Sequence, residues 1–417
     1  MATGEISLDA PLLLAQIQTL GAIGHDPHQG GRTRVALTDE EKAGRDQLVQ
    51  WMRELALDVR VDRVGNILGI LHAESAEGDA HPLMMGSHID TVRNAGALDG
   101  CYGVLAGLAV VRAYRKQGIQ PRRAIIVAAF TNEEGVRFQP DMMGSLVYAA
   151  GLPVQTALDT IGNDGARLGD ELARIGYAGD MEPGSIIPNE YIELHIEQGP
   201  ILEAEGKQIG VVEDLQGISW QKVSIQGVAN HAGTTPTRLR HDAGYAAAAC
   251  IAYLREEVVG ASLDTTLATT GSLRLEPDVI NVIPRKATFT VDLRDPDEQR
   301  LQSAERSFAA FLTEIAEREG VKVETEGLVR FEPVVFDRRI AERIEAAATR
   351  RGLSHMRMTS GAGHDAQMMA RIAPAAMIFV PSRGGISHNP REHTDDVQLV
   401  LGAQILLDVV QDCMAAD

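Results

Sequence analysis

The sequence predicts an α/β fold into which a smaller α+β domain is inserted, and two patterns support this prediction. Short apolar segments alternate with amphipathic helical segments through most of the 417 residues, which is typical of a sheet covered by helices. Between residues 216 and 328 the pattern changes to strands with a period of two and two long helices. We therefore expect a larger discontinuous domain, 1–215 and 329–417, and an inserted domain, 216–328.

In the larger domain, four apolar segments are predicted as buried strands, and each is followed by polar residues of the kind that binds metal ions. The strands span residues 82–86, 123–130, 191–194 and 375–380, and a helix is predicted over 102–116. In an open α/β sheet, ligand-binding residues gather at the carboxyl ends of the strands. We therefore expect these polar residues to converge at one edge of the sheet.

The inserted domain alternates strands and helices in the order βαββαβ, the split βαβ arrangement of a small α+β domain. The predicted strands are 219–225, 265–275, 286–293 and 321–325, and the predicted helices are 242–257 and 297–319. Residues 286–293 alternate apolar and polar side chains most clearly, which is typical of a strand with one buried face.

The composition narrows the classes of partner. The formal net charge of −19 argues against nucleic acid or an anionic membrane surface as a partner. Residues 1–14 lack a basic region before an apolar run, so we predict no secretory leader. A run of ~18 apolar residues is not evident either, so we predict no membrane span.

The cysteine content indicates the compartment. The chain has three cysteines, Cys101, Cys250 and Cys413, and none is close to another in sequence. This usage is typical of reduced thiols and predicts a cytoplasmic protein. Cys101 follows Asp99 closely, yet we interpret it as a small buried helix residue rather than a metal ligand.

The most informative residues are histidines and acids that follow the predicted strands: His88, Asp99, Glu134, His195 and His388. Two metal ions about 3.5–4 Å apart need a bridging carboxylate and terminal ligands on each ion. Asp99 lies in a glycine-flanked turn and suits the bridge. His88 and His195 suit one terminal position on each ion, and Glu134 and His388 complete the shells. Because the set contains no cysteine, we expect zinc, manganese, cobalt or nickel.

Two further acids lie beside these residues. Asp90 stands two positions after His88 and can accept the other ring N–H of that histidine, which would fix its tautomer. Glu133 precedes Glu134 and is the natural general base for an attacking water, and later the acid for the leaving nitrogen. By itself, this acidic pair would be interpreted as a solvated pair. Its position directly after an apolar strand favours the catalytic interpretation.

The segments that carry these residues resemble the dinuclear metallohydrolase superfamily of aminoacylases and aminopeptidase-like carboxypeptidases. More specifically, they resemble its amidase branch, the hydantoinase/carbamoylase family. That family includes N-carbamoyl-L-amino-acid hydrolase, allantoate amidohydrolase and β-ureidopropionase. The resemblance runs from residue 31 to residue 392, and its most specific motifs are residues 133–138, 194–200, 230–236 and 360–366.

The resemblance implies a mixed-sheet, aminopeptidase-like catalytic domain with an inserted ferredoxin-like lid that carries the dimer contact. It implies two divalent metal ions per subunit on the five ligands named above, with Glu133 as the base. It also implies a homodimer in which the lid residue His231 reaches the active site of the partner subunit and stabilises the oxyanion. Without the resemblance, His231 would be interpreted as a turn histidine.

The resemblance also implies contacts to a small carbamoyl or ureido carboxylate. Asn281 and Arg294 match the pair that binds the substrate carboxylate, for which an arginine fork is well suited. Gln198 matches a residue that hydrogen-bonds the ureido end. Gly363 lies in a glycine loop whose backbone N–H groups would face the carboxylate, and His364 would support that loop. From the residues alone, Arg294 could equally pair with a neighbouring aspartate.

Trp220 bears on the choice of substrate. Allantoate amidohydrolases are expected to carry a basic residue at this position, so Trp220 resembles the carbamoyl-amino-acid enzymes. An aromatic residue packed in the lid core is an equal alternative. We predict hydrolysis of the carbamoyl C–N bond of N-carbamoyl-L-amino acids to the L-amino acid, CO2 and NH3.

Three alternatives remain open from the sequence. Hydrolysis of allantoate or of β-ureidopropionate is the nearest alternative to the predicted activity. A dinuclear aminoacylase or peptidase is more distant, because residues 133–138 and 361–364 have the amidase-branch form. A catalytically silent metal-binding or interaction protein is disfavoured by the intact Glu133 and ligand set.

Overall fold

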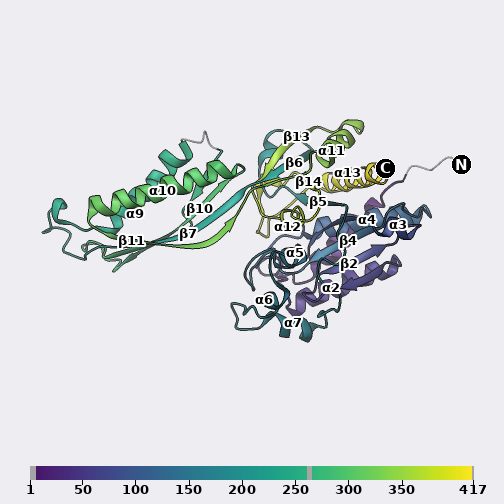
Figure 1. Ribbon diagram of the computed structural model, residues 1–417, viewed down its shortest axis with the longest axis horizontal. Helices are drawn as coiled ribbons and strands as arrows, with labels where there is room; N and C mark the ends of the chain where they lie inside the picture. Colours follow the sequence, from purple (N-terminus) through teal and green to yellow (C-terminus); the bar gives the residue numbers. More distant parts are fainter. Residues whose placement is uncertain (1–5, 261–264, 416–417) are drawn as a thin grey trace. The chain divides into compact units, whose positions relative to one another are not determined.

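The chain forms two compact units in a computed structural model that describes residues 6–260 and 265–415 (Figure 1). Unit 1 comprises Met1–Glu213 and Phe336–Asp417, and unit 2 comprises Asp214–Val335. The boundary predicted at residue 328 falls inside a strand of unit 2 that spans Lys322–Phe331. Unit 2 itself continues to Val335. Residues 1–5, the start of the segment considered as a secretory leader, lie outside the described residues.

Unit 1 is built on a mixed sheet that has nine strands among the described residues. The strands are β1 (Asp58–Val61), β2 (Ile67–Leu71), β3 (Leu83–His88), β4 (Ile125–Phe130), β5 (Glu190–Ile196), β6 (Ile209–Leu215), β12 (Val334–Val335), β13 (His355–Ser360) and β14 (Ala375–Val380). Their order is β1-β2-β4-β3-β5-β14-β6-β12, and β13 pairs with β6. Strands β4, β3, β5 and β14 at the centre run parallel. Strands β6 and β12 pair where the chain enters and leaves unit 2.

The four strands predicted for this unit are the four central parallel strands, so this part of the prediction is confirmed. Every residue of β3, β4 and β14 is buried, as expected for parallel strands covered on both faces. One detail differs, because His195 lies within β5 rather than after it. The predicted helix over 102–116 is confirmed as α4 (Cys101–Lys116).

The helices of unit 1 pack in two groups on the central strands. Helices α1 (Ala10–Ala22), α4, α11 (Arg338–Arg350) and α13 (Asp396–Ala415) pack on one another, and the last three also pack on the sheet. Helices α5 (Met143–Tyr148) and α12 (Asp365–Met369) pack on each other and on the sheet. The remaining elements are α2 (Asp39–Glu54), α3 (Ala76–Asp79), α6 (Val154–Leu158), α7 (Leu168–Ile175), α8 (Ile201–Ala204) and the turn η3 (Arg383–Gly385).

Helix α13 corrects the expectation that the chain has no run long and apolar enough to cross a membrane. It is the one helix of the described residues that passes this test by length and composition. In the structure, 56% of its apolar window is buried, and the helix packs against α4, α11 and β14. Its apolar side chains therefore contribute to the core of unit 1.

Unit 2 follows the predicted βαββαβ order, except that the second predicted strand is divided in two. Its elements are β7 (Gly217–Gln226), the turn η1 (Thr237–Leu239), α9 (Ala243–Tyr253), the π-helical turn η2 (Leu254–Val259), β8 (Leu267–Thr269), β9 (Leu273–Glu276), β10 (Lys286–Asp295), α10 (Glu298–Glu319) and β11 (Lys322–Phe331). The strand predicted over 265–275 is instead two short strands, β8 and β9, which both pair with β10. The break contains Gly271, and glycine weakens a strand interior.

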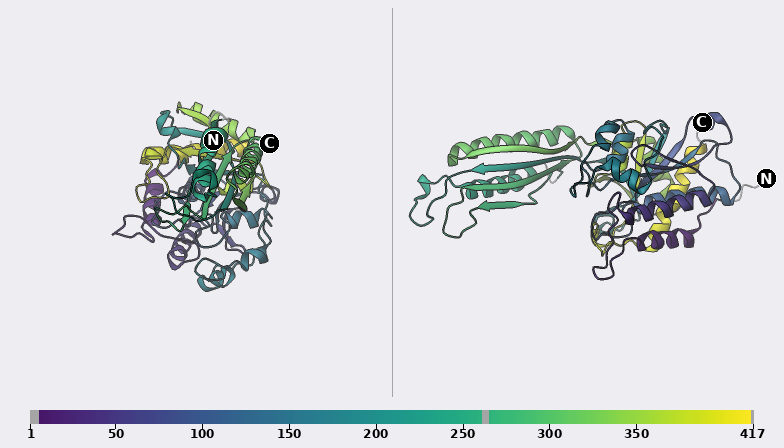
Figure 2. Two further views of the ribbon diagram at one scale, coloured as in Figure 1. Left: turned by 90° about the vertical axis from the view of Figure 1, so that its left-hand side faces the viewer. Right: turned by 90° about the horizontal axis from the view of Figure 1, so that it is seen from below.

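The sheet of unit 2 has the order β11-β7-β10-β8, with every neighbouring pair antiparallel. Helices α9 and α10 run along the strands on one face (Figures 1 and 2). The core between the helices and the sheet includes Val223, Phe289 and Phe308. Because β10 alternates strictly between buried and half-buried residues, its other side chains lie on the face away from the helices.

Candidate metal centre

Four of the predicted ligands lie at the carboxyl ends of neighbouring parallel strands. His88 is the last residue of β3, Glu134 follows β4 after a short turn, and His195 is the penultimate residue of β5. His388 follows β14 and the turn η3. The ladder hydrogen bonds of buried strands fix these ends, so the sheet itself brings the four side chains together.

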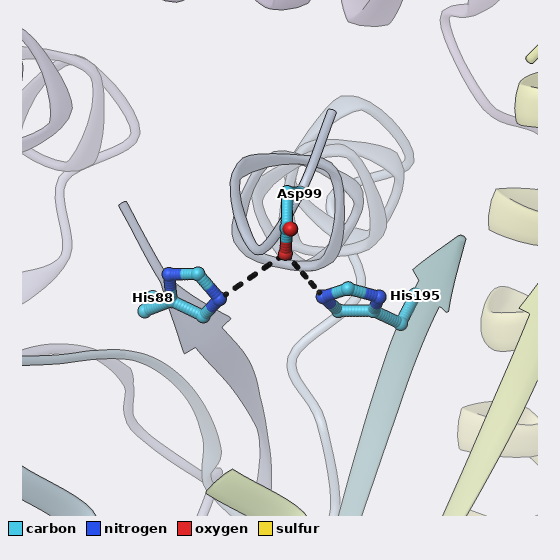
Figure 3. Close-up of side chains that lie close together, drawn as sticks. All are labelled: His88, Asp99 and His195. Atoms are coloured by element: carbon cyan, nitrogen blue, oxygen red, sulfur yellow. Dashed lines mark ion pairs between the residues drawn. The ribbon is translucent and has the colours of Figure 1, made fainter. Parts of the chain in front are cut away.

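Asp99 lies at the centre of this group, between the rings of His88 and His195 (Figure 3). Its Oδ1 is 3.5 Å from His88 Nε2 and 3.2 Å from His195 Nε2. Its Oδ2 is 3.2 Å from His388 Nε2, which is itself 3.4 Å from Glu134 Oε2. The five residues therefore form two donor groups that share Asp99, and within each group the ligand atoms lie within 4.8 Å of one another.

The structure corrects the expected allocation of the histidines, in which His88 and His195 served different ions. Both rings face the same Asp99 oxygen, and their centroids are 6.2 Å apart. The physical reason is that β3 and β5 are adjacent parallel strands, so their ends deliver both imidazoles to one side of Asp99. Glu134 and His388 come from the loops after the two flanking strands, β4 and β14. We call His88 and His195 with Asp99 the first donor group, and Glu134 and His388 with Asp99 the second.

The hydrogen bonds of the first donor group fix the tautomers of both histidines. His88 Nδ1 is 3.0 Å from the backbone carbonyl of Asp90, and His195 Nδ1 is 2.8 Å from that of Ile196. Because a carbonyl oxygen can only accept, each Nδ1 carries the proton. The Nε2 atoms are therefore the ones that face Asp99, where they donate to its carboxylate when the rings are protonated and would bind a metal ion when the rings are neutral. The Gly100 N–H also donates to His195 Nε2, at 3.0 Å.

Asp90 has a different role from the one predicted. Its backbone carbonyl, not its carboxylate, faces His88 Nδ1, since the carboxylate oxygen is 3.7 Å away. The carboxylate instead accepts the backbone N–H groups of Glu133 and Glu134, both at 3.2 Å. Asp90 therefore orients His88 through its main chain and holds the acidic turn through its side chain.

The residues around the two donor groups fit divalent metal ions. Gly100 has a positive φ of 63°, and a Cβ atom there would lie 2.4 Å from His88 Nε2. A larger residue would therefore fill the space beside the ring. Three imidazoles and two carboxylates, without a thiolate, suit zinc, manganese, cobalt or nickel. Cys101 is buried at the start of α4, where its sulfur contacts Arg34, as predicted for a helix residue.

The charges of the cluster also favour a bound cation. Burial raises the pKa of Glu134 to about 8 and that of Glu133 well above its usual range. Burial acts in the same direction on Asp99, but hydrogen bonds from the three histidines hold the pKa of this carboxyl well below its usual range. A buried set of acids that competes for protons is one in which a divalent cation can replace those protons.

Glu133, the predicted base, lies beside the first donor group without belonging to it. Its Oε2 is 3.4 Å from His88 Nε2, and its side chain is nearly buried. The backbone N–H of Met142 donates to its carbonyl oxygen at 2.7 Å, which fixes the turn from the other side. This carboxylate is placed to exchange a proton with a molecule bound at the donor groups.

Gln198 lies within the cluster, and only part of its side chain is available for the predicted hydrogen bond to the ureido end of a substrate. Its side-chain N–H donates to Asp99 Oδ2 at 2.8 Å, so the amide nitrogen serves a ligand. Its Oε1 is buried and has no hydrogen-bond partner among the described residues. Its backbone φ of 58° is unusual for a residue with a side chain. The acceptor that remains is suited to an N–H of a bound ureido group.

His364 contacts a predicted ligand rather than the open part of the site. Its ring is buried and meets the ring of His195 edge-on, with centroids 4.5 Å apart. Its Nε2 is 3.1 Å from Ser360 Oγ. Burial lowers the pKa of His364 well below its usual range, so the ring is neutral. Gly363, the preceding residue, lies near Met142. A Cβ atom at position 363 would be 3.2 Å from Met142 Cε.

Sequence reasoning missed two buried acids beside the cluster. Glu193, two positions before His195 on β5, accepts hydrogen bonds from Ser87 Oγ and the Ala366 N–H. An acid between the apolar residues Ile192 and Leu194 of β5 was the available signal for it. Glu392 lies at the end of the loop that carries His388, and in the sequence nothing distinguishes it from a surface acid.

In unit 2, His231 and Asn281 lie on neighbouring loops. A bridge joins His231 to Val282, and the Ala232 N–H donates to the Asn281 carbonyl at 3.0 Å. Both side chains are exposed. His231 Nδ1 accepts the N–H groups of Gly233 and Thr234, at 3.1 and 3.2 Å. The proton is therefore on Nε2, which points away from the loop backbone.

Arg294 and Trp220 lie at the other end of the sheet in unit 2. Arg294 pairs with Ile218 in the ladder, near the start of β7, whereas Lys286 pairs with Gln226 at the end that leads to His231. Eight residues along β10 separate the two ends, about 27 Å at the rise of an antiparallel strand. The predicted pair of Asn281 and Arg294 is therefore not brought together within one chain.

Two open alternatives for these residues can now be compared with the structure. Arg294 donates from Nε and Nη2 to the Asp292 carboxylate at 2.9–3.1 Å. The ion pair with a neighbouring aspartate, which the sequence left open for Arg294, is therefore present. Trp220 is the cross-strand partner of Asp292, and such partners share a face. Trp220 is therefore on the face away from the helices, not in the lid core.

Comparison with known proteins gives a consistent result. The model of Peptidase family M20/M25/M40 matches residues 84–412. An N-carbamoyl-L-amino-acid amidohydrolase from Rhizobium meliloti is 40% identical over 381 residues, 91% of each chain. The crystal structure of an amidase of the hydantoinase/carbamoylase family from Burkholderia multivorans is 39% identical and covers 99% of each chain, with a TM-score of 0.94.

Relatives that carry other names are only slightly less similar. A ureidoglycolate hydrolase from Arabidopsis thaliana is 35% identical, over 96% of this chain and 86% of the relative. An allantoate amidohydrolase from Bacillus subtilis is 33% identical, over 91% of this chain and 92% of the relative.

A mixed sheet with histidine and carboxylate donor groups at its strand ends, joined to a separate antiparallel α+β unit, defines a metallohydrolase fold. The chain belongs to the M20 family and, within it, to the hydantoinase/carbamoylase amidases. It is therefore an amidohydrolase, and the predicted resemblance is confirmed.

Proposed function

We propose that the protein hydrolyses the carbamoyl C–N bond of N-carbamoyl-L-amino acids to the L-amino acid, CO2 and NH3. The observation that carries this proposal is the position of Glu133 beside two donor groups that share Asp99. The choice of substrate is supported by the relative named for it, which is more similar than those named for ureidoglycolate or allantoate.

The residues of unit 1 would perform the chemical step. The first donor group would hold one divalent metal ion and the second would hold another, with Asp99 between them. Such ions polarise a carbonyl oxygen and lower the pKa of a water molecule. Glu133 would take a proton from the attacking water and deliver it to the amino nitrogen as the C–N bond breaks. The carbamic acid that is released then decomposes to CO2 and NH3.

The residues of unit 2 would bind the charged parts of the substrate and the transition state. His231 has its proton on Nε2 and could donate to the negative charge that develops on the carbamoyl oxygen when the carbon is attacked. Arg294 would bind the substrate carboxylate, exchanging part of its contact with Asp292 for it. Gln198 Oε1 would accept an N–H from the carbamoyl end.

The separation of Arg294 from His231 supports a site composed from two chains. One small substrate cannot reach both ends of the same β10 strand, because they are about 27 Å apart. We therefore infer a homodimer in which each site uses Arg294 of its own chain together with His231 and Asn281 of the partner chain.

Mixed dimers test this composite site. His231→Ala chains refolded with Arg294→Ala chains should regain activity, because one of the two sites in each mixed dimer is complete. His231→Ala chains mixed with Asn281→Ala chains should regain none, because each of the two sites in every mixed dimer then lacks one of these two residues. Recovery in the second mixture, or none in the first when mixed dimers are verified, would contradict the arrangement.

The substrate proposal is tested by ammonia release from metal-loaded protein. The panel should compare N-carbamoyl-L-amino acids with their D-enantiomers, allantoate, ureidoglycolate, β-ureidopropionate and a dipeptide. We expect the highest kcat/KM for an N-carbamoyl-L-amino acid. A higher value for allantoate or β-ureidopropionate would transfer the proposal to that substrate, and preferential hydrolysis of the dipeptide would contradict it.

A further inference from the structure

Glu392 is a buried acid that belongs to neither donor group, yet it contacts the backbone of the shared ligand. Its Oε1 accepts the N–H of Leu98 at 2.9 Å and the N–H of Asp99 at 3.3 Å. These contacts join residues that are 293 and 294 positions apart in sequence. The side chain is 8% exposed. A carboxylate is buried here because backbone donors satisfy its charge.

The turn before Asp99 is shaped to admit this side chain. A Cβ atom on Gly96 would lie 2.1 Å from Glu392 Oε1 and 2.3 Å from Glu392 Cβ. These distances are far below van der Waals contact, so a larger residue at position 96 would displace the carboxylate. The fit between Gly96 and Glu392 therefore fixes where the 96–99 turn lies against the 387–392 loop.

The other oxygen of Glu392 holds the loop that carries His388. Ser387 Oγ is 3.2 Å from Glu392 Oε2 and 3.4 Å from Asp99 Oδ2. The next residue, His388, has a φ of 52°, a conformation that residues with side chains adopt at an energetic cost. Because the His388 ring is half-exposed, its position depends on this loop rather than on core packing.

We propose that Glu392 is a positioning residue that sets the affinity of the second donor group for its metal ion. Through Oε1 it anchors the 387–392 loop on the backbone N–H groups of Leu98 and Asp99, and through Ser387 it holds the part of this loop that carries His388. The first donor group has separate supports, because the backbone carbonyls of Asp90 and Ile196 fix its histidines. Glu392 therefore acts on the group that contains Glu134 and His388.

The test is titration of metal-free protein with Mn²⁺, with free Mn²⁺ measured by electron paramagnetic resonance. Wild type should show two dissociation constants. Glu392→Ala should raise one of them about 10- to 100-fold, the range for loss of a residue that orients metal ligands. It should leave the other unchanged. Unchanged affinity for both ions, or equal weakening of both, would overturn the proposal.

Two comparisons assign the effect to the second donor group. In a His388→Ala background the second group is already disabled, so adding Glu392→Ala should not weaken the remaining ion further. Additional weakening there would show that Glu392 acts on the first group and would overturn the assignment. Activity of Glu392→Ala should also return at high Mn²⁺, a rescue that a merely misfolded loop would not give.

Matched variants keep the test valid if Glu392→Ala fails to fold. Glu392→Gln keeps an oxygen for the two backbone N–H groups and should stay within about fivefold of wild type. Ser387→Ala removes the link to the loop and should weaken the same ion, by less than Glu392→Ala. Asp395→Asn removes one charge from an exposed acid nearby, which pairs with Arg383, and should have no effect. Since no substrate takes part, failure of this proposal would leave the proposed function untouched.

Discussion

The first donor group of unit 1 and the lid loops of unit 2 differ in how their side chains are held. His88, His195 and Asp99 are 1–3% exposed, and partners from several strands fix them. His231 and Asn281 are exposed, and their contacts are to their own and the neighbouring loop. The difference teaches that the core of unit 1 fixes the buried ligands from several directions, whereas the loops of unit 2 that carry His231 and Asn281 rely on local contacts.

The largest effect is expected from the residue shared by both donor groups. Asp99→Ala should abolish activity and metal binding at both groups, because each loses a ligand. His388→Ala should remove one ion and retain the other. Elemental analysis after dialysis measures the metal content. Two retained ions in Asp99→Ala would show that the groups do not share this carboxylate.

The next effect separates catalysis from metal binding within unit 1. Glu133→Gln should lower kcat by about 10²- to 10⁴-fold, the usual contribution of a general base. Its metal content should equal that of wild type, because Glu133 belongs to neither donor group. Glu134→Gln is the matched control, and it should lose metal as well as activity. Near-normal turnover of Glu133→Gln would remove the base assignment.

A smaller effect is expected in the exposed lid loop. His231→Ala should lower kcat by about 10²- to 10³-fold, as when one oxyanion donor is removed. Metal content should not change, since His231 lies in unit 2. His241→Ala is a suitable control, because His241 is another lid histidine, placed against the Glu319 carbonyl. Equal losses in both variants would indicate a general disturbance of the lid.

The smallest effect tests the opposite end of the lid sheet. Arg294→Ala should raise KM by about 10- to 100-fold for carboxylate substrates, the size of a lost hydrogen bond to a charged group. A substrate with a carboxamide in place of the carboxylate should be insensitive to the change. Arg330→Ala, which removes an arginine paired with Glu298 and Glu305, should leave KM unchanged. Steady-state kinetics that show no shift for Arg294→Ala would indicate that Asp292 is its permanent partner.

Some features of the fold could be predicted because they depend on local patterns. The four central strands are uniformly apolar and the lid strand β10 alternates, so both were recognisable. The break between β8 and β9 was not predicted, because Gly271 alone does not reveal whether a strand continues past it. The apolar run in α13 was overlooked, because charged and polar residues interrupt it in sequence.

The candidate site could be predicted in part for a similar reason. Residues directly after apolar strands, such as His88 and Glu134, were expected to converge because strand ends share an edge. The partners of Asp90 and Glu392 were not predictable, because their hydrogen bonds join segments about 40 and almost 300 residues apart. The roles of the individual site residues stay predictions that the variants above will test.

By itself, the sequence determined the type of fold, the inserted unit and the kinds of donor atoms in the site. These follow from periodicity and from residues adjacent to strands, which act over a few positions. The tertiary structure decided which histidines share an oxygen of Asp99, what the Asp90 carboxylate holds, and that Arg294 and His231 lie at opposite ends of one sheet. These depend on strand order and register, and neither is encoded in any single segment.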